Sequence, residues 1–158
     1  FLSAYCQYMN SPSYELDQTD TQSAIDQMQL FLVRYPESTL KDSCNTLIDA
    51  MRTKLEVKDF HGADQYYRMR NYQAAGVAFR NFSRKWPNSR FREDALFFTL
   101  QSDYLLAINS VESKKLDRLK EAIRSYHNFA DAFPQSALLA DATKLHQNLE
   151  AELAATPQ

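Results

Sequence analysis

The chain has 158 residues, of which 44% are hydrophobic and 24% charged, and its formal net charge is -2. This is the composition of a globular domain, and no apolar run approaches the roughly 20 residues that a membrane-spanning helix needs. With only two glycines and five prolines, the chain is poor in the residues that tight β-hairpins require, so we predict an all-α fold.

The N-terminal stretch, FLSAYC, lacks the charged segment and the longer apolar run of a signal peptide. We therefore interpret Cys6 as a helix residue and the chain as a piece of a longer protein. A polar loop is predicted near 10 to 20, and a long helical run from about 39 to 69. No Cys-x-x-Cys pair or histidine cluster accompanies Cys6 or Cys44, and the sequence leaves open whether the two cysteines pair.

Three stretches of the chain, FLVRYPES, SRKWPNSRF and FADAFPQS, share one pattern around a proline. Counted from the proline, Ala stands at −12, a large apolar residue at −8, Phe at −5, another aromatic residue at −1 and Ser at +2. The sets are Ala24, Met28, Phe31, Tyr35, Pro36 and Ser38; Ala75, Phe79, Phe82, Trp86, Pro87 and Ser89; and Ala122, Tyr126, Phe129, Phe133, Pro134 and Ser136.

This pattern predicts a helix, a proline turn and another helix, three times over. Offsets of four, three and four place the apolar residues on one helix face. Proline ends the helix, so the preceding aromatic residue is its last packed side chain, and the serine can cap the next helix. We predict a single α-solenoid domain, 1–158, with repeat units at about 1–38, 39–89 and 90–136 and a C-terminal helix at about 137–154.

The middle repeat is the most regular of the three and resembles a tetratricopeptide repeat (TPR) over residues 62 to 89. Its spacing runs from a small residue, Ala63, through Tyr66 to the turn at Pro87. We interpret both Tyr66 and Tyr67 as core residues. The prolines are 51 and 47 residues apart rather than about 34, and we attribute the surplus to longer helices and to insertions, including one at 109 to 117.

The stretch YYRMRNYQAAGVAFRNFSRKWPNSRFREDALF, with its aromatic-Pro-x-Ser turns, resembles the C-terminal part of the BamD family, also called YfiO or ComL. The resemblance covers roughly residues 20 to 136. It implies a TPR lipoprotein of the outer-membrane β-barrel assembly machinery, a non-catalytic scaffold at the periplasmic face of the bacterial outer membrane. It also implies docking to BamA-like POTRA domains and accessory lipoproteins, and contact with the membrane only through an N-terminal lipid anchor that this chain lacks.

Basic residues concentrate in the middle repeat. Residues 62 to 92 carry seven basic and one acidic side chain, whereas acidic residues prevail on both sides. Helical spacing predicts that Val77, Arg80 and Arg84 face outward from the buried stripe. With Arg70, whose segment meets BamA in that family, they form the predicted partner-binding set, suited to an acidic partner. The alternative is a solvated basic face without a partner.

Other functions find less support in the residues. The aromatic residues lie on the buried stripe, the chain is acidic overall and no nucleic-acid motif occurs, which argues against DNA or RNA as a partner. His127 and Asp131 could form half a metal site, but their position faces solvent, so we expect no metal and no cofactor. No catalytic motif is present. Two alternatives stay open: a peptide-binding periplasmic TPR adaptor that uses its concave groove, and a helical auxiliary domain of a cell-envelope enzyme.

Overall fold

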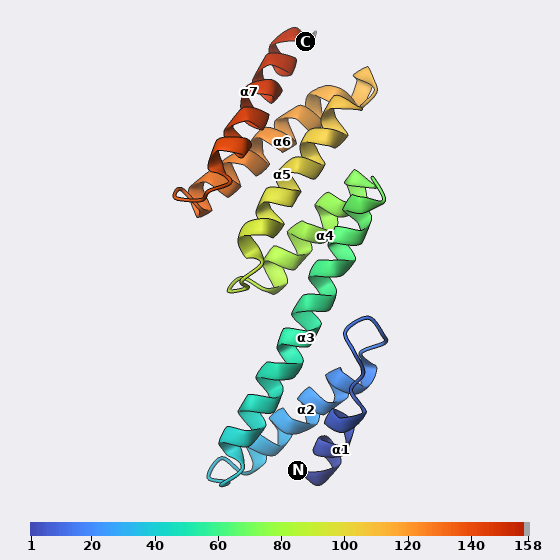
Figure 1. Ribbon diagram of the computed structural model, residues 1–158, viewed down its shortest axis with the longest axis vertical. Helices are drawn as coiled ribbons and strands as arrows, with labels where there is room; N and C mark the ends of the chain where they lie inside the picture. The colour runs from blue at the N-terminus through green and yellow to red at the C-terminus, as the bar shows by residue number, and fades with distance from the viewer. Residues whose placement is uncertain (157–158) are drawn as a thin grey trace. The chain divides into compact units, whose positions relative to one another are not determined.

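The computed structural model describes residues 1–156, and this part of the chain is all-helical, with no strand (Figure 1). The prediction of an all-α fold, compatible with TPR-like repeats, is confirmed. No helix in this range is long and apolar enough to cross a membrane. The seven described helices are α1 (Leu2–Asn10), α2 (Thr19–Arg34), α3 (Lys41–Arg68), α4 (Tyr72–Lys85), α5 (Arg92–Ile108), α6 (Glu112–Ala132) and α7 (Leu139–Ala155).

The chain divides into two compact units, and the boundary falls inside α3, between Asp59 and Phe60. The first unit contains α1, α2 and the N-terminal part of α3. Its core consists of small and medium apolar side chains, which are Ala4, Ala24, Ile25, Met28, Ile48 and Met51. The prediction of a single domain with the repeat boundaries given above stays a prediction.

Two lysines of α3 fix the loop between α1 and α2. Lys54 Nζ donates to the backbone oxygen and the hydroxyl of Ser11, and Lys58 Nζ donates to the backbone oxygens of Tyr14 and Leu16. Gln18, which is 7% exposed, also donates from its Nε2 to the Leu16 oxygen. The predicted polar loop at 10 to 20 is therefore an ordered segment, because its backbone oxygens are satisfied by side chains.

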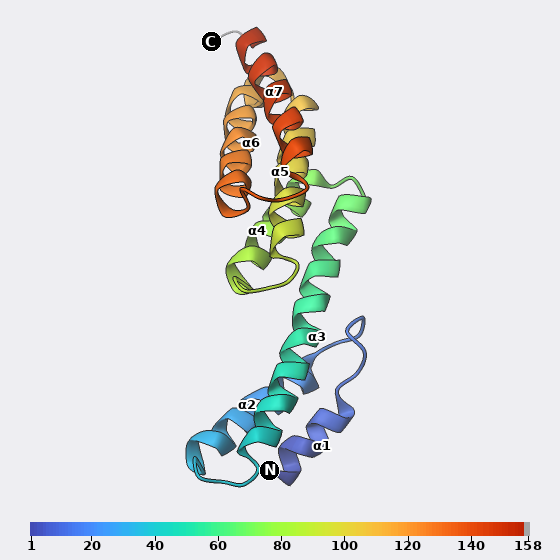
Figure 2. The same cartoon turned by 60° about the vertical axis from the view of Figure 1, so that its left-hand side comes forward.

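The second unit begins at Phe60 and contains the end of α3 together with α4, α5, α6 and α7. Figure 2 shows α5, α6 and α7 lying side by side, as they do in Figure 1. One cluster of buried residues joins the end of α3 to α4 and α5 around the fully buried Phe79. A second joins α5, α6 and α7 around Phe129. Each of these phenylalanines contributes about 3 to 5 kcal/mol by the usual cost of truncation to Ala.

The helices end where the proline pattern predicts. Tyr35, Trp86 and Phe133 are the residues that cap α2, α4 and α6 at their C-termini, and the backbone N–H of each donates to the Phe four residues earlier. The hydroxyl oxygens of Ser38, Ser89 and Ser136 each accept a backbone N–H two residues later. The prediction that these serines cap the next helix is wrong: each caps a short turn, the following helix begins three residues later, and the N-cap residues of α5 and α7 are Phe91 and Leu138.

Tyr35 and the predicted insertion at 109 to 117 differ from what the sequence predicts. Tyr35 is 53% exposed rather than packed, and its ring lies tilted against that of Phe31 on its own helix, with centroids 5.3 Å apart. The predicted insertion at 109 to 117 is mostly helical, because α6 already begins at Glu112. Only three residues connect α5 to α6, and the surplus length lies in the first turns of α6.

The proline turns of the second and third repeats contact each other. The Arg92 guanidinium lies over the Phe133 ring, 5.7 Å from its centroid, and the Ser136 hydroxyl donates to the Glu93 carboxylate. A cation over an aromatic face and a charge-assisted hydrogen bond therefore connect the start of α5 to the end of α6.

Candidate docking site

The candidate site is built on α4, the helix of the basic middle repeat. The side chain of Asn71 caps its N-terminus by accepting the Ala74 backbone N–H at 3.3 Å. Its apolar stripe is buried as the spacing predicts, with Ala75 and Phe79 at 0% and Phe82 at 2% exposed. Helix α4 is thus held rigidly against α3 and α5, so the side chains on its other faces have defined positions.

Arg80 does not face outward as the helical spacing predicted. Its Nη1 atom lies 2.7 Å from Asp103 Oδ2 on α5 and 3.8 Å from Glu121 Oε1 on α6. Only 29% of the Arg80 side chain is exposed. A helical wheel places the Cβ atom, but the long arginine stem reaches around the helix to a buried carboxylate.

Gly76 provides the space for this ion pair. A Cβ atom at position 76 would lie 2.9 Å from Asp103 Oδ1 and 3.4 Å from Arg80 Nη2. Asp103 also accepts a hydrogen bond from the Ser125 hydroxyl at 2.6 Å. The side chains around the buried carboxylate of Asp103 therefore connect α4, α5 and α6, and the absence of a Cβ at Gly76 leaves room for them. We call this set of residues the Asp103 network: Gly76, Arg80, Asp103, Glu121 and Ser125.

The charge of Asp103 is costly at this position. Burial raises the pKa of its carboxyl, while the hydrogen bond from Ser125 and the positive charge of Arg80 oppose that rise. Since Asp103 is only 4% exposed, its ionised form depends on these two partners. The main role that the structure shows for Arg80 is therefore internal.

The other three predicted contact residues lie at the surface. Val77 is 49% exposed, and Arg84, two turns further along α4, is exposed as well. Arg70 is exposed in the turn before α4. Between Gln65 and Arg92 the sequence contains no Asp or Glu. No acidic residue of this segment therefore neutralises its arginines, and this face of the second unit is positively charged.

A groove next to Val77 was not predicted. It has a volume of about 500 Å³ and lies between the end of α3 and α4. Its lining consists of Tyr66, Asn71, Gln73, Ala74, Val77, Ala78 and Asn81. Tyr66 is 44% exposed, so its interpretation as a core residue is wrong, whereas Tyr67 is half-buried against Phe98. The signal for the groove was the run of small and carboxamide residues on the polar side of α4.

Other polar groups of the second unit do not form an alternative site. His127 is exposed, and its ring lies 5.5 Å from that of His146. His146 stacks on Tyr126 and lies 3.3 Å from Glu150. Among residues 1–156, no group of three or more His, Cys, Asp or Glu side chains could hold a metal ion. Cys6 and Cys44 are both unpaired thiols.

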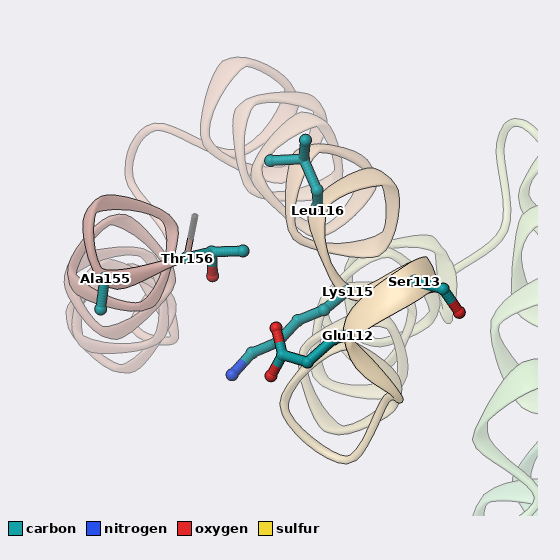
Figure 3. Close-up of a pocket in the computed structure, with 6 residues that line it drawn as sticks. All are labelled: Glu112, Ser113, Lys115, Leu116, Ala155 and Thr156. Atoms are coloured by element: carbon teal, nitrogen blue, oxygen red, sulfur yellow. The ribbon is translucent and has the colours of Figure 1, made fainter. Parts of the chain in front are cut away.

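A second hollow, of about 530 Å³, lies between the start of α6 and the end of α7 (Figure 3). Its cation, Lys115, already lies 2.8 Å from Glu152 Oε2. The hydrogen bond to Glu152 raises the pKa of Lys115. Because the ammonium group is engaged within the protein, this hollow offers less binding chemistry than the groove on α4.

The fold and this surface define an all-α protein of TPR-like helical repeats with a basic, partly apolar face on its middle repeat. A family model described as YfiO, outer membrane lipoprotein, matches residues 1–119. The chain therefore belongs to the YfiO family of outer membrane assembly lipoproteins, the BamD family that the proline turns resemble. No curated protein matches the chain.

Proposed function

We propose that the chain is a non-catalytic scaffold that docks partner proteins at the periplasmic face of the outer membrane. The partners would be BamA-like POTRA domains and accessory lipoproteins, and a lipid anchor on the full-length protein would hold it at the membrane. Membership of the YfiO family supports the assembly role. The observation that carries the docking role is the face of α4, which is rigid, exposed, partly apolar and free of acidic residues in its own segment.

The proposed contact surface consists of Arg70, Val77 and Arg84, with Arg80 at its border. A surface of this kind combines an apolar patch with positive charges, which favours an acidic partner and speeds its association. Arg80 contributes only the exposed part of its guanidinium, beside Glu121. Its larger contribution is indirect, since the Asp103 network holds α4 in place.

The alternative of a peptide-binding adaptor is supported by the groove next to Val77. The alternative of an auxiliary domain of a cell-envelope enzyme has no observation in its favour among the described residues. A lipid-attachment motif and two further repeats upstream in the full-length protein would support the scaffold, whereas a catalytic domain in the same chain would contradict it.

The test is the affinity of the Arg84→Glu variant for the isolated cognate POTRA domains. Charge reversal at an exposed rim position should weaken binding by about tenfold and reduce its dependence on salt. Arg52→Glu, an exposed arginine on α3 in the first unit, is the matched control. Arg80 is unsuitable for charge reversal, because a second carboxylate beside Asp103 would disturb the fold. Equal affinity of Arg84→Glu and Arg52→Glu would remove this patch from the interface.

A further inference from the structure

The groove next to Val77 has the chemistry of a peptide site. Its apolar lining is formed by Ala74, Val77 and Ala78, and Tyr66 contributes an aromatic ring from α3. The carboxamides of Asn71, Gln73 and Asn81 also line it, and the oxygen of Asn71 is already engaged as the cap of α4. A carboxamide both donates and accepts hydrogen bonds, so it can bind the N–H and C=O groups of an extended backbone whatever its sequence.

The residue at the head of the groove has a strained backbone. Helix α3 ends in a Schellman turn, in which the Asn71 N–H donates to the Tyr66 oxygen and the Arg70 N–H donates to the Tyr67 oxygen. The left-handed position of this turn usually belongs to glycine. Here it is occupied by Arg70, with φ of 59°. An arginine at this position costs about 1 kcal/mol relative to glycine, and strain of this kind points to a function of the side chain.

Two exposed arginines flank the lining residues of the groove in the chain. Arg70 directly precedes Asn71, and Arg84 follows Asn81 by about one turn of α4. The two arginines are 14 positions apart in the sequence, which corresponds to about 21 Å at the rise of a helix. An extended chain covers about 3.3 Å per residue, so about six residues span the distance between the two charges.

We propose that this groove binds an extended acidic peptide segment with an apolar side chain at its centre and carboxylates about six residues apart. The carboxylates pair with Arg70 and Arg84, the apolar side chain contacts Val77 and Tyr66, and the carboxamides bind the backbone. The inference rests on the proposed docking function and names the part of the partner that the surface recognises, an extended acidic segment.

The probe is a fluorescein-labelled peptide, Asp-Ala-Leu-Phe-Ala-Ala-Asp, titrated with the full chain and followed by fluorescence anisotropy. We expect saturable binding that Arg70→Gly and Val77→Asp each weaken by about tenfold. Neither substitution should harm the fold, because Arg70→Gly relieves strain and Val77 is half exposed. The Arg52→Glu variant should bind like the parent. Equal binding of the peptide with lysine in place of both aspartates, or unchanged binding by the two groove variants, would overturn the proposal.

Parallel titrations with the cognate POTRA domains separate this inference from the docking function. If Arg84→Glu weakens POTRA binding while the peptide does not bind the parent chain, the peptide inference fails and docking stands. If the peptide responds to both groove variants while POTRA binding responds to none of the three, the peptide site stands and docking through this surface fails.

Discussion

The Asp103 network can be tested by removing its cation. In the Arg80→Leu variant, the buried carboxylate of Asp103 keeps only the Ser125 hydroxyl as a partner. Removal of one member of a buried ion pair costs about 3 to 5 kcal/mol. Because 29% of the Arg80 side chain is exposed, we expect a loss near the lower end, about 3 kcal/mol, in the free energy of unfolding at pH 7.5, measured by urea denaturation.

The stability lost in Arg80→Leu should depend on pH in a defined direction. Burial raises the pKa of Asp103 in the folded protein above its ordinary value, so the folded state takes up a proton more readily than the unfolded state and gains stability from this group as the pH falls. Loss of the Arg80 charge raises that pKa further, and protonated Asp103 no longer needs a cation. The deficit of Arg80→Leu relative to the parent should therefore shrink between pH 7.5 and pH 5.

Two controls accompany the measurement. Arg124→Leu removes an exposed arginine that pairs with Glu121 at 3.0 Å, and it should cost less than about 1 kcal/mol, as surface ion pairs do. Addition of Asp103→Asn to Arg80→Leu should restore most of the loss, because no buried charge remains. A cost of Arg80→Leu no larger than that of Arg124→Leu, or a deficit that is the same at both pH values, would refute the reasoning.

Four further substitutions test the backbone and the repeat. Gly76→Ala should destabilise the protein by about 1 kcal/mol, since the added Cβ would crowd Asp103. Gly62→Ala, whose Cβ would meet no atom within 4 Å, should stabilise α3 by about 1 kcal/mol through helix propensity. A gain in stability at both positions in urea titrations would contradict the crowding argument. Arg70→Gly should raise the free energy of unfolding by about 1 kcal/mol by relieving the left-handed strain, and a lower melting temperature would show that no strain is stored there. Trp86→Ala should lose about 3 kcal/mol, the lower end for aromatic truncation because Trp86 is half-buried, and an unchanged melting temperature would show that the aromatic residue before the proline does not stabilise its repeat.

The sequence predicted the parts of the fold that depend on local spacing. The three alanines at −12 from each proline, Ala24, Ala75 and Ala122, are all 0% exposed, because four-three-four spacing places them on the face that meets the next helix. The helix ends also follow from local chemistry, since proline cannot continue a helix. These features need no knowledge of the rest of the chain.

The features that the sequence did not predict depend on elements far away along the chain. The position of Arg80 depends on a carboxylate on α5, and a period of 3.6 residues says nothing about where a long side chain ends. Tyr66 fits a packed TPR position, yet it is 44% exposed and does not belong to the buried cluster around Phe79. The groove depends on this exposure, so it could not be derived from the spacing of α4 alone.

The contact between the second and third proline turns has a consequence for how the repeats can vary in length. Arg92 on Phe133 and Glu93 with Ser136 fix one end of the α5 and α6 pair, whereas the three-residue connection from α5 to α6 lies at the opposite end. Residues inserted between Phe133 and Ser136 would pull the two contacts out of register, but residues inserted next to Asn109 would only extend the far tip. Natural length variation in this repeat should therefore accumulate at the α5–α6 tip. The interval from Pro87 to Pro134 can then change while the contacts between the two turns are kept.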